Sequence, residues 1–180
     1  MPSVSAGLLL YRRAVARETG ERRLEVLLVH PGGPYWAKKD AGAWSIPKGK
    51  VEPDELGSAP ATVTAAKARN RAAGVDLLAV ARREVTEETG LEPKGPYQPL
   101  GGVKAHHHEL IYAWAVEHDC DPALIVGNEL AIEWPPRSGK QAAFPEVNRA
   151  AWFDLPAARA AIVPAQRRFI DDLEIVAGGA

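Results

Sequence analysis

The sequence predicts a protein of the α/β class, organised as one domain over residues 1–180. Short apolar segments typical of strands alternate along the chain with charged or helix-like segments. Residues 76–89 have helical spacing and form the strongest helix prediction. No repeat or linker divides the chain, and its 180 residues and 19.4 kDa suffice for one domain with a sizeable core.

The composition excludes several classes of protein. Hydrophobic residues make up 46% and charged residues 25%, which excludes global disorder. Twenty-two Lys and Arg against 23 Asp and Glu give a net charge of -1, too acidic for a general nucleic-acid coat. The chain has 1 cysteine, Cys120, which excludes an intrachain disulfide and a cysteine-based zinc cluster. No segment is long enough to span a membrane or reads as a signal peptide, so we expect a cytoplasmic protein.

The first third of the chain predicts strands. Residues 4–11 and 24–30 are apolar enough for buried strands, and the charged residues 12–23 between them predict a hairpin loop. Residues 31–34 predict a turn, and residues 43–47 a short strand that ends at a proline.

The middle of the chain holds an unusual segment and then the main helix. Residues 56–75 are rich in Ala and predict loop, with a marginal helix over residues 64–73. In the helix that follows, Asp76 is the expected N-cap and Gly90 the expected C-cap. Leu77, Ala81 and Val85 recur every four residues and predict one buried stripe.

The last part of the chain predicts further strands and a helical end. The expected strands are residues 97–104, 110–117, 129–134 and 150–155, with a loop at residues 135–140. Residues 106–108 are three histidines and predict a polar turn. Residues 156–176 predict a helical region interrupted near Pro164.

Three glutamates carry the chemical information in the main helix. Glu84, Glu87 and Glu88 stand at i, i+3 and i+4, so they share one helix face, where like charges repel. A divalent cation would reverse that repulsion, and carboxylate oxygens are ligands that Mg²⁺ prefers. A solvated acidic face would explain the same spacing without function. Arg83 before the glutamates and Gly90 after them favour the functional interpretation.

With these neighbours the sequence resembles the Nudix (MutT-like) hydrolases, whose motif reads G-x5-E-x7-R-E-U-x-E-E-x-G-U, with U aliphatic. Residues 83–91 match its second half at every fixed place, and residues 49–55 match G-x5-E. Glu55 and Arg83 are separated by 27 residues (56–82) in place of seven. Deleting residues 56–75 restores the spacing, so we expect an insertion of 20 residues in the loop before the helix.

The resemblance implies a fold, a cofactor and roles for particular residues. It implies an α/β/α sandwich with a mixed sheet, and Mg²⁺ ions (or Mn²⁺) held by Glu84, Glu87 and Glu88 with the carbonyl of Gly49. Arg83 would orient a catalytic carboxylate, with Glu55 as the expected intermediary. For the general base, which varies in this family, the candidate is Glu146 in the loop before residues 150–155; an exposed loop acid without function explains it equally well.

Most substrate-binding candidates lie outside the motif. Lys48 adjoins it and is the first candidate for gripping phosphate, because lysine serves phosphate as a point charge. Tyr35 and Trp36 beside a Gly/Pro loop are candidates for stacking on a nucleobase. Trp114 lies within an apolar strand, and we expect it to be buried in the core. The remaining cationic candidates each also fit a solvated surface residue; they are Lys38, Lys39, Lys50, Arg137 and Lys140.

The function expected from these features is Mg²⁺-dependent pyrophosphohydrolysis of a nucleoside diphosphate linked to another moiety. The segment W-S-I-P-K-G, residues 44–49, resembles that of Nudix enzymes acting on diadenosine polyphosphates and diphosphoinositol phosphates, which favours nucleoside or dinucleoside polyphosphates. A non-catalytic nucleotide-binding regulator and a nucleotide-sanitising NTP pyrophosphatase are the alternatives. We expect a small-molecule partner, neither membrane nor extended nucleic acid, and the insertion or the C-terminal helix as the segment of any homodimer.

Overall fold

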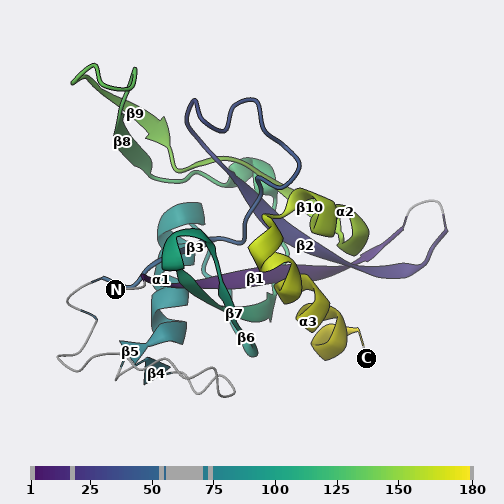
Figure 1. The fold of residues 1–180 in the computed structure, drawn as a ribbon. Helices are drawn as coiled ribbons and strands as arrows, with labels where there is room; N and C mark the ends of the chain where they lie inside the picture. The colour runs from purple at the N-terminus through teal and green to yellow at the C-terminus, as the bar shows by residue number, and fades with distance from the viewer. Residues whose placement is uncertain (1–2, 17–18, 53–54, 56–70, 73–74, 179–180) are drawn as a thin grey trace.

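The structure is a computed structural model that describes residues 3–16, 19–52, 55, 71–72 and 75–178 (Figure 1). A sheet of six strands forms its centre. The strands of this sheet are β1 (Val4–Val15), β2 (Arg22–Pro31), β3 (Lys48–Lys50), β6 (Gln98–Lys104), β7 (Leu110–Glu117) and β10 (Val147–Asp154).

The sheet is mixed, as predicted. Its order is β10-β2-β1-β7-β6, and β3 pairs with β1 beside this path. β1 runs parallel to β7, from Val4 opposite Leu110 to Tyr11 opposite Glu117, and every other pairing in the sheet is antiparallel. β1 therefore lies at the centre and carries neighbours from both halves of the chain.

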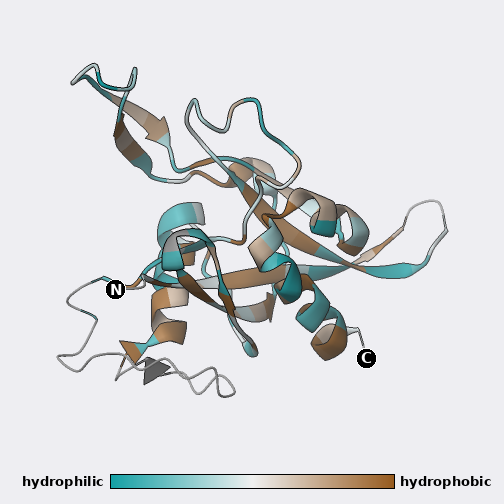
Figure 2. Cartoon of the chain, viewed as in Figure 1, coloured by the Kyte–Doolittle hydropathy of each residue, from teal (hydrophilic) through white to brown (hydrophobic). Residues whose placement is uncertain are grey.

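Helices cover both faces of the sheet. Alternate residues of β1 point to opposite faces, so Leu8 and Leu10 join one apolar cluster and Leu9 joins another. Helix α1 (Leu77–Thr89) packs on the first face, and α2 (Leu155–Ala161) and α3 (Arg167–Ala177) pack on the second. Figure 2 shows apolar colour along the central strands, and on α1 it fades to polar toward the last turn. The predicted α/β/α sandwich is confirmed.

Helix α1 begins and ends where the sequence predicts. The side chain of Asp76 accepts hydrogen bonds from the backbone N–H groups of Leu78 and Ala79, both at 3.2 Å. Gly90 has φ of 72°, a left-handed conformation that glycine adopts at little cost, and its N–H bonds to the carbonyl of Thr86. The predicted stripe of Leu77, Ala81 and Val85 is buried. The caps and the buried stripe fix the position of α1 on the sheet, with the three glutamates in its C-terminal half.

The first hairpin is longer than predicted, because the charged residues 12–15 and 22–23 belong to strands. Glu25 is buried and accepts hydrogen bonds from Arg12 and Arg23. Burial acts to raise the pKa of Glu25, but these hydrogen bonds outweigh it and the pKa is lowered. Ion pairs with Glu25 thus allow charged residues to lie in the sheet. The sequence prediction of a loop at residues 12–23 did not take these pairs into account.

One other strand prediction was wrong, and one strand was missed. Residues 43–47 form isolated bridges, Val29 with Ser45 and Trp44 with Ile162, and the strand follows them as β3. The chain after residue 140 was predicted without a strand, but β9 (Gln141–Pro145) pairs with β8 (Glu129–Glu133). The predicted loop 135–140 closes this hairpin, which projects from the rest of the molecule in Figure 1.

The remaining elements are short. The three histidines form the 3₁₀ turn η1 (His106–His108), η2 covers Pro122–Leu124, and η3 (Pro164–Gln166) interrupts the C-terminal helical region at the predicted place. Within the proposed insertion, β4 (Arg71–Ala72) pairs with β5 (Val75–Asp76), so these residues are strand and not the predicted loop or marginal helix. Residues 56–70 and 73–74 of that segment lie outside the described residues. In the described part of the chain, no helix has the length and apolar character needed to cross a membrane.

Candidate active site

The centre of the candidate site is the contact between α1 and β3. The carboxylate of Glu84 lies directly against the backbone of Gly49. A Cβ added at Gly49 would stand 1.6 Å from Oε2 of Glu84 and 2.1 Å from its Cδ. Only glycine admits this approach, because the carboxylate occupies the space of a side chain. This contact explains why the motif begins with a glycine.

Glu88 is tied to the same strand. Its Oε2 accepts a hydrogen bond from the backbone N–H of Lys48 at 2.9 Å. Burial, and secondarily the charges of Glu146 and Glu84, raise the pKa of Glu88 to about 7, although the hydrogen bond and charge of Lys48 act in the opposite direction. The carboxyl of Glu88 is therefore poised to gain or lose its proton near neutral pH.

The surroundings of Glu84 also disfavour the ionised form of its carboxyl. Its side chain is 12% exposed. Burial raises its pKa, and the charges of Glu87 and Glu52 add to that effect, while Arg83 lowers it. Nη1 of Arg83 lies 2.9 Å from Oε1 of Glu84. The acidic face of α1 thus carries more negative charge than its one arginine offsets.

Arg83 joins the two halves of the motif. It donates from Nε and Nη2 to the two carboxylate oxygens of Glu55, at 3.2 and 3.0 Å, and from Nη1 to Glu87 at 3.0 Å. Such a two-pronged arginine–carboxylate contact fixes both position and orientation. Glu55 therefore reaches Arg83 across the 27 residues (56–82) that separate them in the sequence.

The donors present fit a hard divalent cation in their chemistry. Glu84, Glu87 and Glu88 offer carboxylate oxygens, and two of them have pKa values raised by burial and by neighbouring acids. In the described residues, no three His, Cys, Asp or Glu side chains already converge on one point. Glu84 and Glu87 both form ion pairs with the guanidinium group of Arg83.

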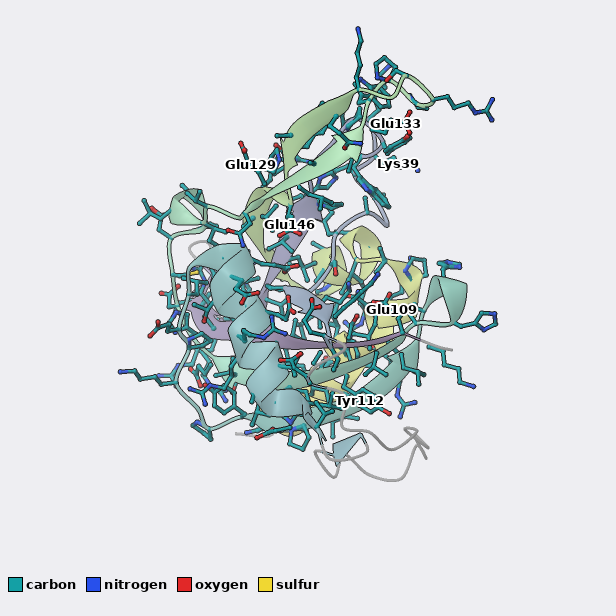
Figure 3. The ribbon with its side chains drawn as sticks, turned by 90° about the vertical axis from the view of Figure 1, so that its left-hand side faces the viewer. Lys39, Glu109, Tyr112, Glu129, Glu133 and Glu146 are labelled. Atoms are coloured by element: carbon teal, nitrogen blue, oxygen red, sulfur yellow. The ribbon has the colours of Figure 1, made fainter. Side chains whose placement is uncertain are left out.

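Glu146 lies near this acidic face, between β9 and β10. Its backbone N–H donates to the carbonyl of Asn128 at 2.8 Å, and its carbonyl accepts from the N–H of Gly32 at 3.1 Å. A register shift between Val147 and Arg149 follows it, and such bulges re-aim side chains. The side chain is exposed, its charge acts on Glu88, and Figure 3 shows it near the end of α1.

Of the predicted lysines, Lys48 has a specific partner. Its Nζ lies 3.7 Å from Oε1 of Glu109, which also accepts a hydrogen bond from Ser5. Lys50 is exposed at the end of β3. The sequence prediction missed Glu109, because nothing in the polar run that contains it indicates that the start of β7 lies beside β1.

The predicted aromatic residues lie in the loop between β2 and β3. Tyr35 is 56% exposed and contacts Trp134 edge to face, with ring centroids 5.4 Å apart. Lys39 lies over the ring of Trp36 at 5.1 Å. Trp134, at the end of β8, was missed by the sequence prediction, which took it only as a strand residue. Trp114 is buried, as predicted.

Arg137 and Lys140 are not brought to the acidic face of α1. Both are exposed at the tip of the β8–β9 hairpin, which Figures 1 and 3 show extending away from the sheet. Arg137 has φ of 64°, and the carbonyl of Lys140 accepts from the N–H of Trp134. The two residues thus lie on the same hairpin as Trp134 and away from the glutamates.

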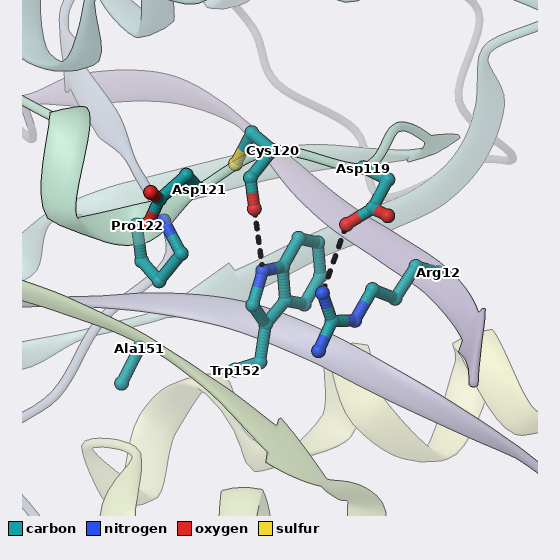
Figure 4. A pocket seen from close by; sticks show the side chains of 7 residues that line it. All are labelled: Arg12, Asp119, Cys120, Asp121, Pro122, Ala151 and Trp152. Atoms are coloured by element: carbon teal, nitrogen blue, oxygen red, sulfur yellow. Dashed lines mark hydrogen bonds and ion pairs between the residues drawn. The ribbon is translucent and has the colours of Figure 1, made fainter. Parts of the chain in front are cut away.

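A hollow of about 660 Å³ lies elsewhere, beside η2 (Figure 4). Several polar groups that line it are bonded to one another. Arg12 lies 4.5 Å above the ring of Trp152 and pairs with Asp119, and Nε1 of Trp152 donates to the carbonyl of Cys120. None of the residues of the acidic face lines it. We therefore place the candidate active site at α1 and β3.

Comparison with known proteins gives the following matches. The model of the family described as NUDIX domain matches residues 5–173. A structure of a C. elegans Ap4A hydrolase binary complex is 17% identical, with TM-score 0.56 and 99% of each chain covered. A Nitrosomonas europaea NUDIX hydrolase is 18% identical, with TM-score 0.54 and 97% of this chain and 90% of that chain covered.

A third structure is the NUDIX domain of Shewanella oneidensis NrtR complexed with ADP ribose. It is 13% identical, with TM-score 0.53 and 97% of this chain and 88% of that chain covered. At such identities the likeness concerns the fold alone. No curated protein matches the sequence.

Proposed function

The chain belongs to the Nudix family of pyrophosphohydrolases, and from the arrangement of its acidic side chains we propose that it cleaves a nucleoside diphosphate linked to another moiety with the help of Mg²⁺. The observation that carries this proposal is the closure of the site across the insertion. Glu84 rests on Gly49 and Arg83 holds Glu55, so the functional groups of both halves of the motif are in contact.

In this proposal Glu84 and Glu88 hold the cation, with Glu87 and the carbonyl of Gly49 as further donors. Bound Mg²⁺ would neutralise phosphate charge and lower the pKa of water. The raised pKa values of Glu84 and Glu88 support this, since carboxylates crowded in this way are stabilised by a cation. Arg83 keeps Glu84, Glu87 and Glu55 oriented. Mn²⁺ has the same preference for oxygen ligands and would substitute.

Glu146 is the proposed general base. Its exposed carboxylate can reach solvent, and its backbone is fixed on both sides by Asn128 and Gly32. A group that accepts a proton from water must be held close to the reacting centre yet remain accessible. The effect of its charge on Glu88 supports this proximity.

For the substrate we favour a nucleoside or dinucleoside polyphosphate. Lys48 adjoins Glu88 through its backbone and is the proposed first phosphate contact, with Lys50 after it. Tyr35 and Trp36 are proposed to stack on a nucleobase, joined by Trp134, with Arg137 and Lys140 contributing positive charge at the hairpin. The resemblance of residues 44–49 to the segment in diadenosine polyphosphate enzymes supports this class.

The test is product analysis on a panel of diphosphates, with Mg²⁺ and with EDTA. The panel holds diadenosine tetraphosphate, ATP, 8-oxo-dGTP, ADP-ribose, NADH and a diphosphoinositol phosphate. We expect Mg²⁺-dependent release of a phosphorylated product from at least one member. Glu88→Gln should lower kcat by about 10²–10³-fold, the range seen when one electrostatic stabiliser is lost. Glu117→Gln, which removes the same charge at the far end of β7, is the control.

A non-catalytic nucleotide-binding regulator is the second candidate, because a NUDIX domain of the same fold was solved in complex with ADP ribose, which shows that this fold can bind such a ligand. Glu84, Glu87, Glu88 and Arg83 are all present, which favours catalysis. Binding of ADP-ribose without turnover of any panel member would favour the regulator instead.

A further inference from the structure

Side chains from β1, β3 and the start of β7 meet on the face of the sheet opposite α1. Directly paired residues share a face, and the register pairs Gly7 with Lys48 and Ser5 with Ile111. Glu109 stands two residues before Ile111 and so points to the same face. Ala6 and Gly49, one position along, face α1.

Glu109 is held in place by a buried partner. Oγ of Ser5 donates to Oε1 of Glu109 at 2.5 Å, and Ser5 has no exposed surface. Figure 3 shows Glu109 beside η1, on the side of the molecule that carries the start of β7. Its side chain is 20% exposed. A carboxylate anchored in this way keeps its charge in one position.

That position is beside the proposed phosphate-binding lysine. Nζ of Lys48 lies 3.7 Å from the same oxygen of Glu109, and its side chain is 24% exposed. Gly7 makes room for the lysine, because a Cβ there would stand 2.6 Å from Cβ of Lys48. The Lys48 backbone meanwhile bonds to Glu88, so the residue links the acidic face of α1 to Glu109.

The pair Lys48–Glu109 has no net charge, although the ammonium group keeps N–H donors for phosphate. A phosphodiester inside a capped diphosphate carries one negative charge, whereas a terminal phosphomonoester carries about 1.5 to 2 at pH 7. The extra charge of the monoester finds no compensation at this pair and is repelled by Glu109. A capped diphosphate suffers less of this repulsion.

We propose that Glu109, anchored by Ser5 beside Lys48, is a specificity-determining residue that favours diphosphates capped at both ends over substrates ending in a free phosphate. This inference rests on the proposed function, because it takes Lys48 as a phosphate contact. It assigns the discrimination to charge and not to shape.

The experiment compares two probes, ADP-ribose, which is capped at both ends, and ATP, which ends in a phosphomonoester. Their Kd values are measured by calorimetry at pH 8 with Ca²⁺ in place of Mg²⁺, under conditions where no product forms. Glu109→Gln should lower the Kd for ATP relative to the Kd for ADP-ribose by about five- to tenfold, as expected for the removal of one partly screened charge. Glu109→Asp retains the charge and should keep the wild-type ratio within about twofold.

The control is Glu117→Gln, which removes the same amount of negative charge at the end of β7 remote from Glu109 and should leave the ratio unchanged. An unchanged ratio in Glu109→Gln, an equal shift in Glu117→Gln, or a shift of the same size in Glu109→Asp would overturn the inference. So would failure of the wild type to bind either probe.

Turnover in Mg²⁺ separates the two proposals. A shifted ratio without hydrolysis of any diphosphate would refute the proposed catalysis and leave the role of Glu109 standing. Hydrolysis with an unchanged ratio would do the reverse.

Discussion

The contact between α1 and β3 differs from the junction between the β8–β9 hairpin and the loop after β2. In the first, Glu84 is buried and pairs with Arg83, and Glu88 accepts a hydrogen bond from the backbone of Lys48. In the second, Tyr35 and Trp134 meet edge to face while Tyr35 stays 56% exposed. The comparison indicates that the residues proposed for catalysis lie where side chains are buried and held by partners (the locked region). The residues proposed to bind the nucleobase lie where side chains remain accessible to solvent (the accessible region).

Gly49→Ala should break the locked region with the largest effect. The new Cβ would overlap the carboxylate of Glu84, which has to move, and overpacking of this kind costs about 1–3 kcal/mol. We expect kcat/KM to fall by at least about 10²-fold, since displacement of a catalytic group by about 1 Å has effects of that size. Thermal unfolding and initial rates measure the two consequences.

Gly139→Ala at the hairpin tip is its counterpart. Gly139 has φ of +69° with nothing within 4 Å of a new Cβ, so the variant tests backbone strain without overlap. It should lose about 1–2 kcal/mol of stability, the cost of a left-handed backbone at a residue with a Cβ, and keep its kcat. Equal activity in the two variants would contradict the distinction between locked and accessible regions.

Glu146→Gln tests the residue that lies between the two regions. Loss of a general base should lower kcat by about 10²-fold with little change in KM. The limb of the pH–rate profile that reports the base should also change. Glu129→Gln, at the start of the same hairpin, serves as the matched control. A pH–rate profile identical to that of the wild type would remove Glu146 from the mechanism.

The raised pKa of Glu88 predicts how stability depends on pH without metal. A carboxyl whose pKa rises on folding, here from 4.5 to about 7, favours the folded state below pH 4.5, and this contribution is lost as pH rises through 7. In EDTA, Glu88→Gln should therefore be more stable than wild type at pH 8, by about 2 kcal/mol after allowance for partial exposure. The difference should shrink to about a quarter of that at pH 5 and vanish below pH 4.5.

Denaturant unfolding at the two pH values measures this difference. Addition of Mg²⁺ at pH 8 should raise the stability of the wild type and close the gap, because a ligand that binds only the folded state stabilises it. A gap of the same size at pH 5 would show that burial of the carboxyl is not its cause.

Tyr35→Ala should have the smallest effect and sharpens the description of the accessible region. Loss of one aromatic contact is worth about 0.5–1.5 kcal/mol, so KM for a nucleotide should rise about two- to twelvefold with kcat unchanged. Stability should change little, because the ring is largely exposed. Tyr97→Phe, at a tyrosine outside the junction, is the control; a fall in kcat would place Tyr35 in the chemistry instead.

The agreement between sequence and structure is best where the relation is local. The caps Asp76 and Gly90 and the stripe through Val85 follow from the geometry of one helix. The strand boundaries of the first hairpin were missed because its charged residues are kept in the sheet by pairing with buried Glu25, a contact across strands. Residues 43–47 have the composition of a strand, yet the chain there makes only isolated bridges.

The sequence by itself determined the family resemblance, the three glutamates on one face of α1 and the glycine that begins the motif, because these depend on spacing along the backbone. Only the tertiary structure decided that Gly49 receives Glu84, that Arg83 reaches Glu55, that Lys48 lies beside Glu109, and that Trp134 meets Tyr35. The physical reason is strand register: pairing of β1 with both β3 and β7 brings together residues whose separation along the chain predicts no contact.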